Sequence, residues 1–151
     1  MIKKVGAIVL SRFDSSRLPG KALREVNNKT LLEYVLEKAF EVKGLDGVCV
    51  ATSCRGIDDP IADLCIQNNV PIFRGSGDNV AERFIGCMEY NDWSAALRIN
   101  GDSPLHSSDL LSKAVDIYSP NQMDIVTNVF PRTYPIGMSV ELISVLALKK
   151  A

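Results

Sequence analysis

The stretch Val5-Gly6-Ala7-Ile8-Val9-Leu10 decides the fold, because it is a continuous apolar run of strand length. Such a run is typical of a strand that is buried on both faces of a parallel sheet. Further along, Thr30-Leu31-Leu32-Glu33 has the pattern of a capping box, in which two side chains satisfy free N–H groups at a helix start. The apolar positions that follow recur at helical spacing, so we expect a helix after this strand.

The same alternation of strand and helix patterns continues to the end of the chain. Further strands are expected at 47–52, 70–73, 95–99, 123–127 and 139–143, and further helices are expected to begin at caps Asp59, Asp78 and Ser107 and near Ser144. Alternating units of this kind require right-handed crossovers. The sequence therefore predicts an α/β protein with three α/β/α layers around a doubly wound, mainly parallel sheet.

Composition limits what such a chain can do. The 151 residues are 46% hydrophobic and 23% charged, which suits one globular domain and excludes a disordered chain. Lys and Arg number 17 against 18 Asp and Glu, for a net charge of −1. This near-balance argues against a protein that holds nucleic acid by general basicity. No apolar stretch approaches the roughly 18 residues of a membrane span, so no membrane partner is expected.

The cysteines give no sign of a structural zinc site. Cys49, Cys54, Cys65 and Cys87 form no C-x-x-C pair, and the only histidine is His106. Three of the four cysteines lie in apolar-periodic segments, where free buried thiols are expected. The apolar run near the N-terminus is too short for a signal peptide and meets charged residues without a cleavage pattern. We therefore expect a reducing, cytoplasmic compartment.

Ligands in open α/β sheets bind beyond the carboxyl ends of the strands, so the loop after the first strand is searched first. It has the sequence S-R-F-D-S-S-R-L-P-G-K over residues 11–21, and it matches neither a Walker loop nor a dinucleotide fingerprint. Arg12 and Arg17 can form forked bonds to phosphate oxygens, and Lys21 adds a point charge. The hydroxyls of Ser15 and Ser16 add donors. A solvated charged loop is the alternative, but so many such groups in one short loop favour a polyanion site.

The loop after the expected strand at 95–99 contains the second candidate, Gly101-Asp102-Ser103-Pro104. A carboxylate at a strand end, across from a cationic loop, is suited to hold an Mg²⁺ ion that bridges phosphates. An ordinary turn is the alternative, since Asp is common in turns for its local hydrogen bonds. The two loops together favour a metal site with Asp102 as a ligand.

These segments together resemble the signature of the nucleotide-sugar cytidylyltransferases, which activate Kdo, sialic acid and related acidic sugars as CMP conjugates. The opening S-R-F-D-S-S-R-L-P-G-K-A-L at residues 11–23 carries most of the resemblance, and R-L-P-G-K after a first strand is a specific motif. Further similar segments lie in the family's order and spacing, at 51–53, 58–61, 73–76, 82–83, 98–105 and 134–141. The pattern is most similar to the branch named for spore-coat polysaccharide biosynthesis.

The resemblance implies roles for individual side chains. The loop that wraps the triphosphate of CTP is matched by Arg12, Ser16, Arg17 and Lys21, with Ser15 beside them. Asp102 matches the aspartate that helps bind the catalytic Mg²⁺. Positions near the base and ribose are matched by Ala51, Thr52, Arg74 and Ser76, and Asn100 stands where relatives often have Gln or Thr. Tyr134 and Glu141 fall in the region that is expected to face the sugar or a partner subunit; for Glu141, a charged residue on a strand edge is an equal alternative.

The implied reaction is attack by a sugar hydroxyl or anomeric oxygen on the α-phosphate of CTP, with release of pyrophosphate. CTP and a sugar are then the partners, and a homodimer is compatible with the resemblance. Two alternatives stay open: a truncated or degenerate CTP-binding domain without catalysis, and a related nucleotidyltransferase that uses another NTP. The family's members run past this length, so we expect residues 1–151 to be a single nucleotidyltransferase domain that lacks the family's C-terminal part and its second metal-binding aspartate.

Overall fold

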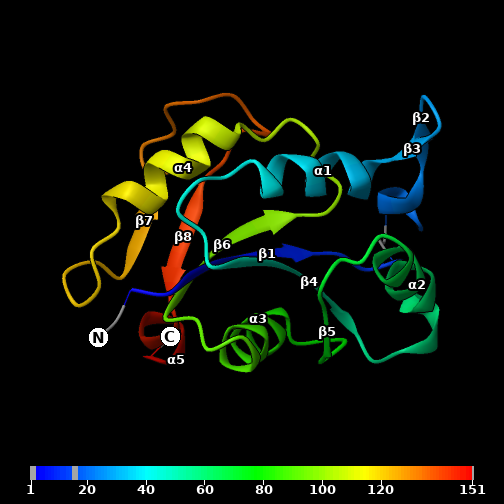
Figure 1. Ribbon diagram of the computed structural model, residues 1–151, viewed down its shortest axis with the longest axis horizontal. Helices are drawn as coiled ribbons and strands as arrows, with labels where there is room; N and C mark the ends of the chain where they lie inside the picture. Colours follow the sequence, from blue (N-terminus) through cyan, green and yellow to red (C-terminus); the bar gives the residue numbers. More distant parts are fainter. Residues whose placement is uncertain (1–2, 15–16, 151) are drawn as a thin grey trace.

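The computed structural model describes residues 3–14 and 17–150, whose main feature is a six-stranded sheet with helices on both faces (Figure 1). The strands lie in the order β5-β4-β1-β6-β8-β7. Their bounds are β1 (Val5–Leu10), β4 (Gly47–Ser53), β5 (Ile72–Gly75), β6 (Ala95–Asn100), β7 (Ile125–Thr127) and β8 (Glu141–Ser144). The helices are α1 (Leu31–Phe40), α2 (Asp59–Gln67), α3 (Val80–Tyr90), α4 (Ser108–Ile117) and α5 (Val145–Lys150).

Strand β1 lies in the middle of the parallel part of the sheet. It pairs in parallel with β4 and β6, and β4 pairs in parallel with β5. Strand β8 runs antiparallel to β6, and β7 runs antiparallel to β8. The predicted doubly wound, mainly parallel sheet is therefore confirmed, with β8 reversed. Because β1, β4, β5 and β6 run the same way, their carboxyl ends meet at one edge of the sheet.

The two faces of the sheet are covered by different helices. Helices α1 and α4 lie over one face, and α3 and α5 lie over the other (Figure 1). Leu32 of α1 and Leu111 of α4 belong to the core on the first face, whereas Phe84 and Met88 of α3 belong to the core on the second. The middle of β1 is buried from both sides, as its unbroken apolar sequence predicts.

Helix starts follow the predicted caps at Thr30 and Ser107 and shift by one residue in two other helices. The Thr30 hydroxyl accepts a hydrogen bond from Glu33 N–H, and the Glu33 carboxylate accepts one from Thr30 N–H, so the predicted capping box is confirmed. The cap of α3 is Asn79 rather than Asp78. Asn and Asp are almost equally good caps, so their order in the turn cannot be decided from residue type. Asp59 is the first residue of α2 rather than its cap.

A short hairpin between β1 and α1 was not predicted. It is formed by β2 (Glu25–Val26) and β3 (Lys29–Thr30), which pair antiparallel. The turn residues Asn27 and Asn28 have φ angles of 52° and 60°. Asparagine tolerates this left-handed region, and two such residues suit a two-residue hairpin turn.

Three strands begin two residues later than predicted, at Ile72, Ile125 and Glu141. The first of these shifts has a clear cause. Val70 still closes the end of α2, because its N–H donates to the carbonyl of Cys65 at 2.8 Å. The apolar character of Val70 therefore serves the core and not the sheet.

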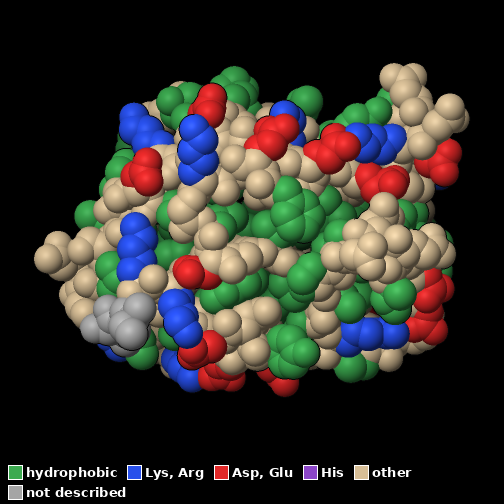
Figure 2. Space-filling view, in the orientation of Figure 1, with side chains coloured by type: hydrophobic (Ala, Val, Ile, Leu, Met, Phe, Trp, Pro, Cys, Tyr) green, Lys and Arg blue, Asp and Glu red, His purple; other side chains and the backbone are tan. Residues whose placement is uncertain are grey.

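The predicted free, buried thiols are confirmed. Cys49, Cys65 and Cys87 are free and buried, whereas Cys54 is free and exposed. No described helix is long and apolar enough to cross a lipid bilayer. On the face that Figure 2 shows, basic and acidic side chains are interspersed, in keeping with the near-balanced charge.

Candidate active site

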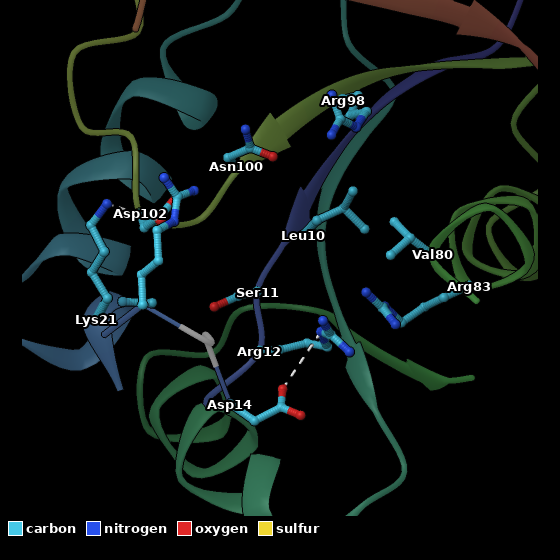
Figure 3. A pocket seen from close by; sticks show the side chains of 12 residues that line it. Leu10, Ser11, Arg12, Asp14, Lys21, Val80, Arg83, Arg98, Asn100 and Asp102 are labelled. Carbon is cyan, nitrogen blue, oxygen red and sulfur yellow. Dashed lines mark ion pairs between the residues drawn. The ribbon is translucent and has the colours of Figure 1, made fainter. Parts of the chain in front are cut away.

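A pocket of about 390 Å³ opens at the carboxyl ends of β1 and β6, where the two predicted loops meet (Figure 3). Its volume falls in the range of small-molecule sites. The described residues that line it are Leu10, Ser11, Arg12, Asp14, Arg17, Lys21, Ala22, Val80, Arg83, Arg98, Asn100 and Asp102. Five of these side chains are basic and two are carboxylates, so the pocket favours an anion.

Lys21 and Asp102 join the two predicted loops within this pocket. The Lys21 ammonium lies 3.2 Å from a carboxylate oxygen of Asp102, and each side chain is about two-fifths exposed. Arg12, Arg17 and Asn100 line the same pocket. The structure therefore brings together five side chains that the sequence predicted for one site; what each of them binds remains a prediction.

The basic loop between β1 and Lys21 is folded back on itself around Phe13. The carbonyl of Phe13 accepts a hydrogen bond from Gly20 N–H at 2.7 Å. Gly20 has a φ of 68°, and a Cβ there would lie 2.9 Å from the Phe13 ring. A glycine is thus required at position 20 on both grounds. Lys21 is the first residue of the short 3₁₀ helix η1 (Lys21–Leu23), so the start of this helix lies at the pocket.

Arg83 is a pocket residue for which the sequence predicted no role. It lies on α3 with only 2% of its surface exposed, and Figure 3 shows its guanidinium turned into the pocket toward Arg12. Its Nη1 donates to the Ser76 carbonyl at 2.5 Å, while its buried Nε has no partner in the described part of the chain. The signal for it in the sequence is a cation on the apolar face of a helix, between Val80 and Phe84.

Charge around Arg83 is incompletely balanced. Burial lowers the pKa of the Arg83 guanidinium most, Arg12 lowers it further, and Asp58 raises it. Arginine remains a cation at any working pH, so this environment leaves a buried positive charge that an anion in the pocket can compensate.

Arg98 and Glu141 form a second ion pair at the pocket. Arg98 lines the pocket from β6, and its Nη1 lies 2.5 Å from a Glu141 carboxylate oxygen on the neighbouring strand β8. The sequence predicted no role for Arg98, and for Glu141 it left open a position facing the sugar or a partner subunit and a charged residue on a strand edge. In the structure Glu141 neutralises a pocket arginine, whereas Tyr134 is not among the described lining residues.

Four predicted base or ribose contacts do not line the pocket. Ala51 and Thr52 are wholly buried in β4. Arg74 donates to the backbone carbonyls of Ser53 and Arg55 and pairs with Asp59 at 2.7 Å, so it ties β5 to the start of α2. The Ser76 hydroxyl accepts from Asn79 N–H at 3.1 Å in the turn before α3. Contact between these four residues and a nucleotide remains a prediction, and the predicted donors Ser15 and Ser16 lie outside the described residues.

A divalent metal fits this pocket only if a bound polyphosphate supplies part of its coordination. The described residues contain no group of three or more His, Cys, Asp or Glu side chains that could hold a metal ion. Asp102 is a partly exposed carboxylate on the pocket wall, and Mg²⁺ is commonly held by one or two carboxylates together with substrate phosphates and water. The donor set therefore fits an Mg²⁺ ion that shares its coordination with a polyphosphate.

Comparison with known proteins identifies the family. A family model described as cytidylyltransferase matches residues 6–143, nearly the whole chain. The chain belongs to the cytidylyltransferase family. The chain is 34% identical over 148 residues to an uncharacterized protein of Methanocaldococcus jannaschii, and that match covers 98% of this chain and 60% of the relative. It is 30% identical over 141 residues to the spore coat polysaccharide biosynthesis protein SpsF of Bacillus subtilis, covering 91% of this chain and 58% of SpsF.

Solved structures agree with this assignment. A cytidylyltransferase from Leptospira borgpetersenii superposes with a TM-score of 0.91 at 32% identity, covering 99% of this chain and 63% of that one. A CMP:2-keto-3-deoxy-manno-octonic acid synthetase complexed with CTP superposes with a TM-score of 0.78 at 16% identity, covering 98% of this chain and 77% of that one, which shows the shared fold. The chain spans about three-fifths of the length of the curated relatives named above.

Proposed function

We propose that this cytidylyltransferase transfers CMP from CTP to an acidic or cell-surface polysaccharide sugar, with release of pyrophosphate and with Mg²⁺ held at Asp102. One observation carries the proposal: the basic loop after β1 and the carboxylate after β6 meet in a single pocket, with Lys21 3.2 Å from Asp102. Membership of the family supports CTP as the nucleotide, and the similarity to SpsF supports a polysaccharide sugar as the acceptor.

The basic side chains of the pocket would bind the triphosphate. Arg12 and Arg83 present guanidinium groups, which match phosphate oxygens with paired donors, and Lys21 presents a compact charge. Arg12 is already directed by a 2.5 Å hydrogen bond from its Nη1 to the carbonyl of Gly77. Binding at fixed cations orients the α-phosphate and removes the entropic cost of alignment from the chemical step.

Transfer needs no covalent intermediate with the protein. The acceptor oxygen forms a bond to the α-phosphorus, the bond from that phosphorus to the bridging oxygen of the β-phosphate breaks, and the electron pair leaves with pyrophosphate. The proton of the acceptor oxygen passes to water. Negative charge grows on the leaving pyrophosphate, so cations fixed around it stabilise the transition state more than the ground state.

Asp102 would contribute an oxygen ligand opposite these cations. A bound Mg²⁺ supplies Lewis-acid polarisation of phosphate oxygens. In the structure Asp102 is held by Lys21, and a partly exposed ion pair of this kind is worth about 0–1 kcal/mol. Both side chains can therefore exchange their mutual contact for a nucleotide and its metal at small cost.

A second candidate, CTP binding without transfer, is favoured by the scarcity of free carboxylates. Of the two that line the described pocket, Asp14 already pairs with Arg55 at 2.6 Å and with Arg12 at 3.6 Å. Asp102 is the other pocket carboxylate, and its only described ion-pair partner is Lys21, which belongs to the same site. A single carboxylate suffices to help bind a metal–nucleotide complex, whereas transfer also needs a site for the sugar.

A pyrophosphate-release assay decides between the two candidates. The protein is incubated with CTP, Mg²⁺ and a panel of acidic sugars, with Lys21→Ala as the site variant and Lys38→Ala as a matched control on α1. Release that depends on one sugar and is lost in Lys21→Ala supports transfer. Binding of CTP without release supports the second candidate, and absence of both contradicts both.

A further inference from the structure

The basic loop is anchored from behind by a buried carboxylate, Asp58, which does not line the pocket. Asp58 is wholly buried. Its Oδ1 accepts a hydrogen bond from Phe13 N–H at 2.6 Å, and its Oδ2 accepts one from the hydroxyl of Ser53 at the end of β4. The first contact joins the cap position before α2 to the basic loop across 45 positions of sequence.

Asp58 stands at a position where a different contact would be expected. It occupies the cap position of α2, yet its side chain accepts no hydrogen bond from the first turn of that helix. Aspartate is a favoured cap because its side chain normally makes that bond. Here the carboxylate is turned toward the basic loop instead. It accepts a hydrogen bond from Phe13 rather than from the first turn of its own helix.

Both backbone groups of Phe13 are thereby engaged. Its N–H donates to Asp58, and its carbonyl accepts from Gly20 at 2.7 Å. Phe13 thus closes the loop that contains Arg17 and leads to Lys21. Because Arg12 is separated from this N–H by one peptide bond, fixing Phe13 also fixes the backbone from which the Arg12 side chain leaves.

The charged side chains around Asp58 also support a role for it in positioning the basic loop. Arg55 bridges the two carboxylates there, at 2.6 Å from Asp14 and 3.9 Å from Asp58. Asp58 also offsets part of the positive charge that Arg12 and Arg55 impose on Arg83. Loss of the Asp58 charge would increase repulsion among three arginines, two of which line the pocket.

We propose that Asp58 is a positioning residue for triphosphate binding: it pins Phe13, and so sets where Arg12 presents its guanidinium, without touching the nucleotide. This inference rests on the proposed binding of CTP at the pocket. It assigns to Asp58 an effect on the triphosphate that is separable from any effect on the nucleoside.

The test compares Asp58→Asn with Asp63→Asn, the same change at an exposed position of α2. Asparagine keeps the size of Asp58 but removes its charge and replaces one of two acceptor oxygens with a donor. Calorimetry measures the affinities for CTP and for CMP with Mg²⁺, and NMR measures exchange of the Phe13 amide against those of Val9 and Val50 in the core strands. The Phe13 amide reports on its hydrogen bond to Asp58 in the absence of nucleotide, and the amides of Val9 and Val50 serve as references.

In Asp58→Asn the amide oxygen can still accept from Phe13 N–H, but that bond loses its charge assistance and the arginines lose the Asp58 charge, so we expect CTP affinity to fall about tenfold. CMP affinity stays nearly unchanged, and the Phe13 amide exchanges faster while Val9 and Val50 keep their protection. Equal losses for CTP and CMP, or a Phe13 amide as protected as in the wild type, overturn the proposal. Asp63→Asn should behave like the wild type.

A second variant keeps the test decisive if Asp58→Asn does not fold. Ser53→Ala removes the hydroxyl that donates to Asp58 Oδ2 and leaves the carboxylate in place. A smaller loss of CTP affinity with the same CTP-to-CMP contrast supports the proposal, and unchanged CTP affinity contradicts it. If the wild type binds no CTP, the proposed function fails by itself, while faster exchange of Phe13 in either variant still supports the anchor.

Discussion

The ammonium of Lys21 lies 3.2 Å from the carboxylate of Asp102, and this pair joins the loop after β1 to the loop after β6. The two side chains have opposite tasks in the proposed site, since one binds phosphate and the other binds a metal. Their ion pair holds both at the pocket before a nucleotide arrives. Because each is about two-fifths exposed, the pair contributes little to folding and can be exchanged for ligands.

Lys21→Ala is expected to weaken CTP binding without unfolding the protein. Loss of one charge-assisted contact to phosphate should reduce CTP affinity about tenfold to a hundredfold. The thermal midpoint without nucleotide should change little, because the Lys21–Asp102 pair is partly exposed. Calorimetric titration with CTP checks this, with Lys38→Ala on α1 as the control. Unchanged CTP affinity in Lys21→Ala would remove Lys21 from the site.

Asp102→Asn is expected to remove the effect of Mg²⁺ on CTP binding rather than CTP binding itself. Asparagine is a much poorer ligand for Mg²⁺ than a carboxylate, and Lys21 is freed to contact phosphate. Thermal-shift titrations with CTP, with and without Mg²⁺, measure the difference. In the wild type Mg²⁺ should add to the stabilisation by CTP, whereas in Asp102→Asn it should add nothing. Asp109→Asn in the first turn of α4 is the control, and equal Mg²⁺ effects in Asp102→Asn and Asp109→Asn exclude Asp102 as a ligand.

The parts of this structure that were predicted from the sequence are those encoded locally. The apolar run of β1 and the capping box at Thr30 each depend on neighbouring residues, and both are confirmed. The meeting of Lys21 with Asp102 was also predictable, because parallel strands deliver their carboxyl ends to one edge of the sheet.

The parts that were missed depend on contacts between distant segments. The sequence predicted no role for Asp58, because Asp59 was expected to be the helix cap, and only the fold shows that the Asp58 carboxylate accepts a hydrogen bond from Phe13 N–H. Arg74, which the resemblance matches to a position near the base and ribose, donates to the carbonyl of Ser53 at the end of β4 and to that of Arg55 just beyond it, and its contact with a nucleotide remains a prediction. A side chain's partner outside its own element cannot be identified from residue type and spacing.

Gly6→Ala is expected to destabilise the protein by about 3 kcal/mol through overpacking. A Cβ on Gly6 would lie 2.1 Å from the indole ring of Trp93, which is buried against β1. Gly56→Ala is the matched control, since its nearest contact would be an ordinary 3.7 Å to the Asp59 carboxylate. Urea unfolding of both variants measures the difference, and equal stabilities would show that Trp93 does not pack as described.

Stability is expected to fall on mild acidification because of His106. This buried histidine has no hydrogen-bond partner on either ring nitrogen in the described part of the chain, and burial lowers its pKa below the usual 6.5. The unfolded chain therefore takes up a proton first, so the free energy of unfolding decreases as the pH falls below about 6.5.

The variant His106→Leu isolates this effect. Thermal midpoints between about pH 7.5 and about pH 5 should decline in the wild type and stay flatter in His106→Leu. Hydrogen bonds from Thr30 lower the pKa of Glu33 from 4.5, so the stability that Glu33 contributes is lost only at more acidic pH. An equal decline in His106→Leu would assign the pH dependence to other groups.

Calorimetric titration of the wild-type protein with CTP, UTP, ATP and GTP in the presence of Mg²⁺ tests the central claim most directly. The claim is that the pocket lined by Lys21 and Asp102 is a CTP site. We predict saturable binding of CTP at one site per chain, tighter than binding of the other three nucleotides. Absence of CTP binding, or tighter binding of another nucleotide, would contradict it.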